Sequence, residues 1–233
     1  MKKLGFLVLF GLAVGASRAD AACGTFEVAK GDIKVQSAGK VVPVSTGGKI
    51  CSGDTVISGS DSRAKIKMAD GNELNISPDS KIVIEDYQYD KADNKKKVLL
   101  NILKGKVRAT TREDNMYTDK AKDGQANTFQ IRTKSAVAGV RGTDFLTSFD
   151  PSTNKTGVVT FKGKVEFGSV GKDGKVSNSV QVTAGLSTSM VGGQAPEPPK
   201  PVPPSELKSL NSETRAESAG GTGQNDNGRG PEG

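Results

Sequence analysis

The chain of 233 residues contains no histidine, so it lacks the side chain on which most acid–base catalysis in proteins depends. This absence excludes Ser-His-Asp triads and zinc mechanisms that need an imidazole. The sequence also contains neither a Gly-x-Ser-x-Gly nucleophile elbow nor a Gly-x4-Gly-Lys-Ser/Thr phosphate loop. Adjacent acids such as Glu85 and Asp86 point to opposite faces of an expected strand and do not form a two-acid site. We therefore predict a protein that is not an enzyme and that holds no cofactor.

Charge of one sign is not concentrated anywhere in the chain. The 33 basic and 26 acidic residues give a formal net charge of +7, and the two signs are interspersed. Nucleic-acid-binding proteins usually present a concentrated basic face. The one short cluster, Lys95-Lys96-Lys97, follows acidic residues and is typical of a solvated loop. We therefore predict no nucleic-acid partner.

Only one long apolar run occurs, at residues 4–14, where glycines alone interrupt it. Lys2 and Lys3 precede this run, and a small-x-small pattern follows at residues 19–21. This order predicts a secretory signal peptide over residues 1–21, because the run is too short to span a bilayer. A retained membrane anchor is the alternative. We expect an exported, periplasmic protein with no integral membrane segment after signal cleavage.

The sequence has two cysteines, Cys23 and Cys51. In an oxidising compartment, an even set of cysteines favours a disulfide, here Cys23–Cys51. The alternatives are two free thiols, or a Cys23 that is lipidated as the first residue of an envelope-anchored lipoprotein. Asp20 stands where lipoprotein processing needs an aliphatic residue. We predict no metal site, because two cysteines without histidine rarely complete a zinc site.

Composition divides the chain into a signal peptide at 1–21, a β-patterned body at 22–191 and a tail at 192–233. The body alternates apolar and polar residues in short runs, for example at 64–68, and turn signals separate these runs. We therefore predict an all-β fold, either an antiparallel sandwich or a short stacked β-solenoid. The tail begins with a proline-rich stretch, which predicts an extended linker, and one short helix is expected at 205–216. The glycine-rich end is expected to be disordered.

One motif recurs three times in the body. Gly31, Gly105 and Gly163 each follow a lysine and precede alternating charged and apolar residues. Glycine supplies the left-handed backbone angle that a tight bend needs, and the alternation then buries one face of the strand. The motif predicts a chain that turns in a similar way at several levels.

Several further motifs occur along the body. Gly53-Asp54 predicts a turn whose carboxylate caps nearby amides, and Asp70-Gly71 predicts a two-residue hairpin loop. Gly142 permits an unusual backbone angle or the close approach of another strand. In order, the motifs are Ser-Gly-Asp-Thr-Val at 52–56, Met-Ala-Asp-Gly-Asn at 68–72, Leu-Lys-Gly-Lys-Val at 103–107, Val-Ala-Gly-Val-Arg-Gly-Thr-Asp-Phe at 137–145 and Gly-Lys-Val-Glu-Phe at 163–167. Their order and number resemble the FecR-type domain, an exported all-β sensing module best known from bacterial iron-transport signalling.

Arg141, Thr143 and Asp144 are the candidate residues for contact with a ligand or partner. In the alternative reading, which we favour for Arg141, its guanidinium forks onto backbone carbonyls or a carboxylate and pins the turn.

The resemblance also implies a biological role. Signalling members of the family carry an anti-sigma segment and a membrane helix before the domain, and a secretin/TonB-like domain after it. At those positions this sequence has a signal peptide and a proline-rich tail. We therefore expect a stand-alone, non-catalytic binding or scaffold module of the bacterial envelope, which recognises a protein or glycan partner. The alternative is a periplasmic regulatory sensor that acts with a separate membrane protein. The sequence leaves the oligomeric state open.

Overall fold

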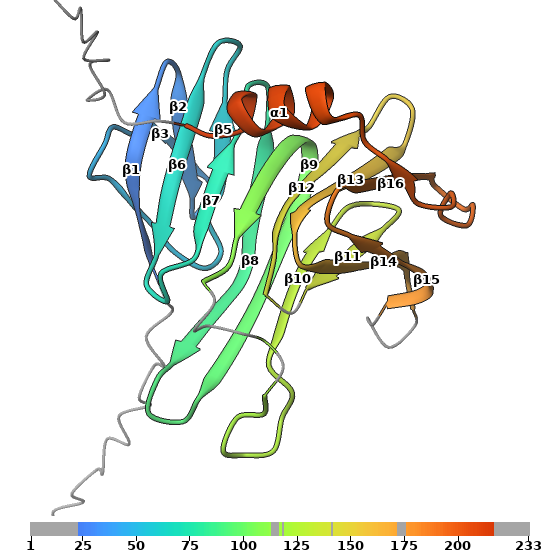
Figure 1. Ribbon diagram of the computed structural model, residues 1–233. Coiled ribbons are helices and arrows are strands. Elements are labelled where there is room, and N and C mark those ends of the chain that lie inside the picture. Colours follow the sequence, from blue (N-terminus) through green and yellow to red (C-terminus); the bar gives the residue numbers. More distant parts are fainter. Residues whose placement is uncertain (1–22, 113–116, 118, 141, 172–175, 217–233) are drawn as a thin grey trace, which may run out of the picture.

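The computed structural model describes residues 23–112, 117, 119–140, 142–171 and 176–216, so the expected signal peptide and the glycine-rich end lie outside it. The described residues form 17 strands and one helix, which confirms the all-β class (Figure 1). Within those residues, no helix is both long and apolar enough to cross a membrane.

Strand β9 (Lys95–Thr110) joins two sheets, because its first part pairs with β8 and β10 and its second part pairs with β7 and β12. In spatial order, sheet 1 contains β4 (Lys49–Ile50), β1 (Gly24–Lys30), β6 (Arg63–Met68), β7 (Glu73–Ile76), the end of β9, β12 (Asp144–Asp150), β13 (Lys155–Lys162), β16 (Leu186–Val191) and β17 (Lys200–Pro201). Sheet 2 contains β3 (Lys40–Pro43), β2 (Ile33–Ser37), β5 (Thr55–Ser58), β8 (Lys81–Asp90), the start of β9, β10 (Thr128–Arg132), β11 (Val137–Val140), β14 (Lys164–Val170) and β15 (Val176–Thr183). Every pairing is antiparallel except β9–β10.

The inner faces of the two sheets share one hydrophobic core. Alternation along each strand supplies its members; on β6, for example, Ala64 and Ile66 are fully buried. Phe129 of sheet 2 meets Phe145 of sheet 1 edge to face, with ring centroids 6.2 Å apart. Burial of one such ring stabilises the fold by roughly 1.5–3 kcal/mol. The arrangement is therefore a β-sandwich.

The recurring Lys-Gly motif marks points where the chain passes from one sheet to the other. Gly31 lies between β1 and β2, Gly105 lies within β9, and Gly163 lies between β13 and β14. All three have positive φ, between +80° and +90°. A Cβ at Gly163 would lie 2.5 Å from the carbonyl oxygen of Gly142, so this bend stacks directly on a neighbouring bend.

The proline-rich stretch does not extend as a free linker. The backbone amide of Glu197 donates to Ser189 of β16, and β17 pairs with the start of the same strand. Helix α1 (Pro204–Glu213) then runs across sheet 1 (Figure 1). The polyproline conformation and an edge strand share an extended backbone, so composition predicted the conformation without revealing that this stretch lies against the body. The helix begins after Pro203, and no side chain caps its first turn.

Candidate functional site

The outer face of sheet 1 is covered where α1 crosses it. The register places Asn75 of β7, Arg108 of β9 and Leu146 of β12 in one row, and all three are buried although they point away from the core. Phe161 of β13 lies beside Arg108, with its ring centroid 3.9 Å from the guanidinium carbon. Together with Asp144, we call these residues the α1 dock. They form a site that is assembled by four different strands.

Arg108 and Asp144 form a buried ion pair at the centre of the α1 dock. Arg108 Nε donates to Asp144 Oδ1 at 2.7 Å, and Nη2 donates to Oδ2 at 2.6 Å. Thr110 adds a hydroxyl bond to Oδ1 at 3.2 Å. A bidentate arginine–carboxylate pair fixes both position and orientation, and burial is tolerated only where the remaining polar atoms are satisfied.

The remaining donors of Arg108 bind the end of α1. Nη1 donates to the carbonyl oxygen of Asn211 at 3.1 Å and to Thr214 Oγ1 at 3.2 Å, while Nη2 donates to Asn211 Oδ1 at 2.9 Å. A helix leaves its last carbonyls without intrahelical partners, and cations are favoured there. Arg63 also donates to the carbonyl of Glu213, and the amide of Ala216 donates to Asn75 Oδ1 at 3.0 Å. Arg63, Asn75 and Arg108 therefore hold residues 211–216 of the same chain through backbone carbonyls, one backbone amide and the side chains of Asn211 and Thr214.

A hollow of about 400 Å³ lies beside the α1 dock. Charges of both signs and apolar groups line it, from Arg63, the turn at 77–79, residues 104–106, residues 149–151 and the end of α1.

The predicted contact residues have different positions relative to this site. Arg141 lies outside the described residues. Asp144 belongs to the α1 dock, where its carboxylate is engaged by the chain itself. Thr143 is buried beside it: its amide donates to Thr111 Oγ1 at 2.7 Å and its carbonyl accepts from the Thr111 amide at 2.9 Å. Gly142 has a φ of +113°, the unusual angle that its glycine permits. A partner-binding role for Thr143 and Asp144 stays a prediction.

Arg108 is the site residue that sequence reasoning missed. It occupies a charged position in the alternating run 104–109, and such a position normally faces water. Only the covering of this face by α1 buries Arg108 completely. The one available signal was the acid of the 137–145 motif, which needs a cation when it is buried.

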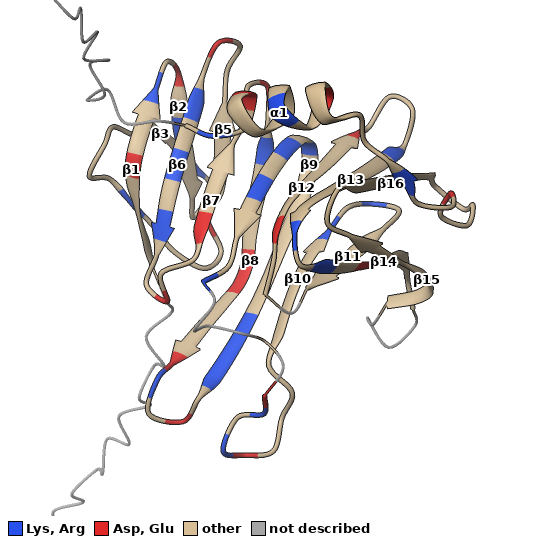
Figure 2. Cartoon of the chain, viewed as in Figure 1, with Lys and Arg blue, Asp and Glu red and all other residues tan. Residues whose placement is uncertain are grey.

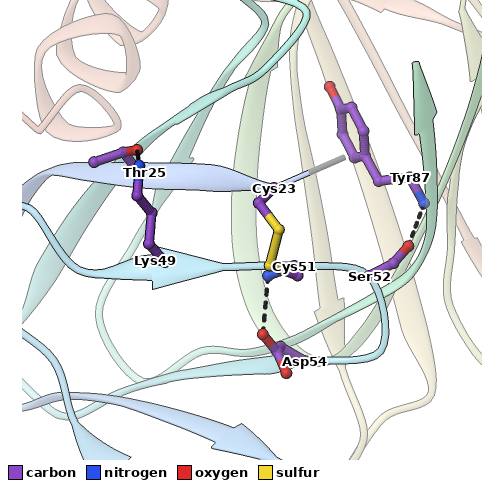
Figure 3. Close-up of a disulfide and its surroundings, with 7 residues drawn as sticks. All are labelled: Cys23, Thr25, Lys49, Cys51, Ser52, Asp54 and Tyr87. Carbon is purple, nitrogen blue, oxygen red and sulfur yellow. Dashed lines mark hydrogen bonds between the residues drawn. A yellow bond between two sulfur atoms is a disulfide. The ribbon is translucent and has the colours of Figure 1, made fainter. Parts of the chain in front are cut away.

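The predicted Gly53-Asp54 turn lies beside the disulfide, away from the α1 dock. Asp54 accepts a hydrogen bond from the Cys51 amide at 2.9 Å (Figure 3). Gly53, the residue before it, has a φ of +90°. The predicted disulfide is confirmed: Cys23 is bonded to Cys51, and their Cα atoms are 4.1 Å apart. It joins the residue that precedes β1 to the residue that follows β4.

Asp70 is part of a buried polar cluster, which we call the Asp70 cluster, with Asn72, Tyr87 and Tyr117. Gly71, in the same hairpin, has a φ of +83°. Tyr87 Oη donates to the Asp70 carboxylate at 2.9 Å, and Tyr117 Oη donates to it at 3.1 Å. Asn72 Nδ2 bridges all three side chains. Burial raises the pKa of both tyrosines well above the usual range, and the Asp70 charge acts in the same direction. The cluster therefore consists of neutral donors around one carboxylate.

Charges on the exposed part of sheet 1 form a ladder of opposite signs (Figure 2). Lys65 Nζ lies 3.2 Å from Glu27 Oε2 and 3.3 Å from Glu73 Oε2. Lys67 Nζ lies 3.0 Å from Glu73 Oε1. Among the described residues, no group of three or more Cys, Asp or Glu side chains is placed to hold a metal ion.

Comparison with known proteins gives one family. The family described as FecR protein matches residues 54–166, which include both Arg108 and Asp144 and exclude the disulfide and α1. No curated protein matches the chain.

Two crystal structures from Parabacteroides distasonis, each described as a candidate anti-sigma factor, resemble the chain. The first has 13% identity and a TM-score of 0.49, over 67% of this chain and 63% of that chain. The second has 14% identity and a TM-score of 0.46, over 63% of this chain and 59% of that chain. This chain thus spans less than two thirds of the length of those relatives.

Proposed function

Because residues 54–166 make this chain a member of the FecR family, we propose that it is a non-catalytic, exported module that acts by binding a protein partner in the bacterial envelope. The observation that carries the proposal is the α1 dock. There the family segment holds a polypeptide segment from outside its own limits, by charge-assisted bonds from Arg108 to Asn211. A surface that recognises one helix end by its carbonyls has the chemistry to recognise polypeptide in general.

Two features support the exported location. The basic and apolar start of the chain has the order of a signal peptide. The Cys23–Cys51 disulfide is a bond that persists in oxidising compartments and is rare in the cytosol. Intact mass of protein recovered from the periplasm tests this part, since the mass reports signal cleavage after Ala21 and the loss of two hydrogens in the disulfide.

The partner is to be sought beside the α1 dock. A photo-crosslinking residue in place of Lys106, which is exposed at the rim of the 400 Å³ hollow, is expected to capture one specific envelope protein in living cells. The matched control carries the same residue in place of Lys40, which is exposed on β3 at the edge of sheet 2. Equal capture at the two positions, or capture of glycan alone, contradicts the proposal.

Family membership favours a second candidate function, a regulatory sensor that acts with a separate membrane protein. Deletion of the gene is then expected to change transport or stress transcripts under nutrient limitation, and complementation restores them. Unchanged transcripts under every tested limitation contradict the sensor and leave simple binding as the function.

A further inference from the structure

The sandwich has several open sheet edges, and the chain protects most of them. An unprotected edge strand offers free backbone groups that pair with another chain. On sheet 1, residues 44–50 cover β1, because the amide of Phe26 donates to Gly48 and the amide of Gly47 donates to Phe26. At the opposite end of sheet 1, β17 is two residues long and includes Pro201. Both ends of sheet 1 are therefore poor templates for pairing.

On sheet 2, β3 is protected by a proline. The amide of Val44 donates to the carbonyl oxygen of Ile33, so the backbone groups of Val44 point toward β2. In an antiparallel pair the direction alternates from one residue to the next, so the residues at odd distances from Val44 direct their backbone groups away from β2. Those residues are Val41 and Pro43. Because proline has no N–H, the outer edge of β3 presents a single backbone donor, at Val41.

Strand β15 has a β-bulge at Asn178, whose φ is +47°, but in its regular end at residues 180–183 it has neither a proline nor a covering segment among the described residues. It has eight residues, with no proline and no charged side chain. The amide of Ala184 donates to Gly163, and the alternation of an antiparallel ladder then directs Gln181 and Thr183 outward. Both are exposed, whereas Val182 between them is buried in the core. Within the described part of the chain, β14 is the one strand that pairs with β15, which ends sheet 2 (Figure 1).

We propose that two copies of this chain pair through β15, antiparallel, about a two-fold axis at Val182. Gln181 of one copy then lies opposite the partner's Thr183, and the reverse, so that four backbone hydrogen bonds join the two copies of sheet 2. The charges of β14 favour this register. Within each copy, Glu166 pairs with Gln181 and Lys164 pairs with Thr183. Across the dimer, each row of opposed residues therefore runs from Glu166 through Gln181 and the partner's Thr183 to the partner's Lys164, with opposite charges at its two ends. A two-fold axis at Gln181 or Thr183 places like charges at both ends of a row.

This inference does not depend on the proposed function. A contact of one short strand is smaller than the standard protein–protein interface, so the dimer is expected to form at micromolar to millimolar concentration and to dissociate on dilution.

Sedimentation equilibrium of the full mature chain over that concentration range tests the pairing. The expected result is a reversible shift from monomer toward twice the monomer mass. Gln181→Lys with Thr183→Lys places two like-charged pairs directly opposite each other and is expected to weaken the dimer about tenfold or more. Thr183→Pro removes one outward amide, leaves the bonds to β14 in place, and is expected to weaken the dimer as well.

The matched control is Val41→Lys with Val42→Lys on β3, where both side chains are about half exposed, at 50% and 51%. This variant is expected to dimerise like the wild type. A wild-type chain that stays monomeric throughout overturns the proposal. A dimer that resists both β15 variants, or that the β3 variant abolishes, also overturns it, because the contact then lies elsewhere. Circular dichroism of each variant verifies that it is folded.

Discussion

Replacement of Asp144 by alanine tests whether the acid of the 137–145 motif is an internal anchor. The change leaves Arg108, which is completely buried, without its carboxylate. Asp144 accepts two charge-assisted bonds from Arg108, and each such bond contributes about 1.5–3 kcal/mol. Removal of one partner from a buried pair costs about 3–5 kcal/mol. Because Arg108 keeps its contacts with Asn211 and Thr214, we expect the free energy of unfolding to fall by about 3 kcal/mol, the lower end of that range.

Urea unfolding followed by far-ultraviolet circular dichroism measures this loss, since the chain has no tryptophan for fluorescence. With a slope of about 2 kcal/mol per molar urea, the midpoint falls by about 1.5 M. Asp150→Ala is the matched control on the same strand, because that carboxylate bonds only to Ser152 and Thr153 in its own turn. The control midpoint is expected to stay close to that of the wild type.

A double-mutant cycle measures the interaction energy between Arg108 and Asp144 separately from the contribution of each residue alone. The double variant Arg108→Met with Asp144→Leu is expected to lose less stability than the Arg108→Met and Asp144→Leu single variants together, because it leaves no unpaired buried charge, although it still loses the bonds from Arg108 to Asn211 and Thr214. Deletion of residues 204–233 gives Arg108 access to water and is expected to reduce the loss caused by Asp144→Ala. A loss below about 1 kcal/mol for Asp144→Ala in the full chain refutes the reasoning. An Arg108→Met, Asp144→Leu double variant that loses as much stability as the Arg108→Met and Asp144→Leu single variants together refutes it too.

Three further predictions concern other parts of the fold. Replacement of Cys23 and Cys51 by alanine is expected to cost about 3.5 kcal/mol in urea unfolding, from the chain entropy of a loop with a sequence separation of 28, and an unchanged midpoint contradicts this account. Gly163→Ala is expected to lower the melting temperature more than Gly185→Ala: both glycines have a φ near +80°, but a Cβ at Gly163 meets a backbone oxygen at 2.5 Å, whereas a Cβ at Gly185 meets nothing within 4 Å. The two tyrosines of the Asp70 cluster have a raised pKa in the folded state, so their contribution to stability is complete below about pH 10 and decreases as the pH rises further, when the unfolded chain ionises. Absorbance at 295 nm is expected to show them ionising together with alkaline unfolding, and their ionisation in protein that remains folded by circular dichroism contradicts the buried cluster.

Local features of this protein could be read from the order of residues. Alternation at 64–68 predicted a strand with one buried face, because side chains on a strand point to opposite sides in turn. The Lys-Gly motifs predicted similar bends, because glycine alone adopts a positive φ without strain, and all three bends lie at crossings between sheets. The Cys23–Cys51 disulfide was predicted because an even number of cysteines in an oxidising compartment favours pairing. Each of these inferences depends on a residue and its near neighbours.

Tertiary structure alone decided which polar residues became buried and which edges stayed open. Arg108 reads as a solvent-facing residue until a helix about 100 positions later covers it, and Asp144 becomes an anchor only because β9 and β12 are adjacent. The proline-rich stretch is extended by its own chemistry, yet its place against β16 depends on an edge that composition does not reveal. Burial and edge pairing depend on which distant segments meet, and spacing along the chain does not specify those contacts.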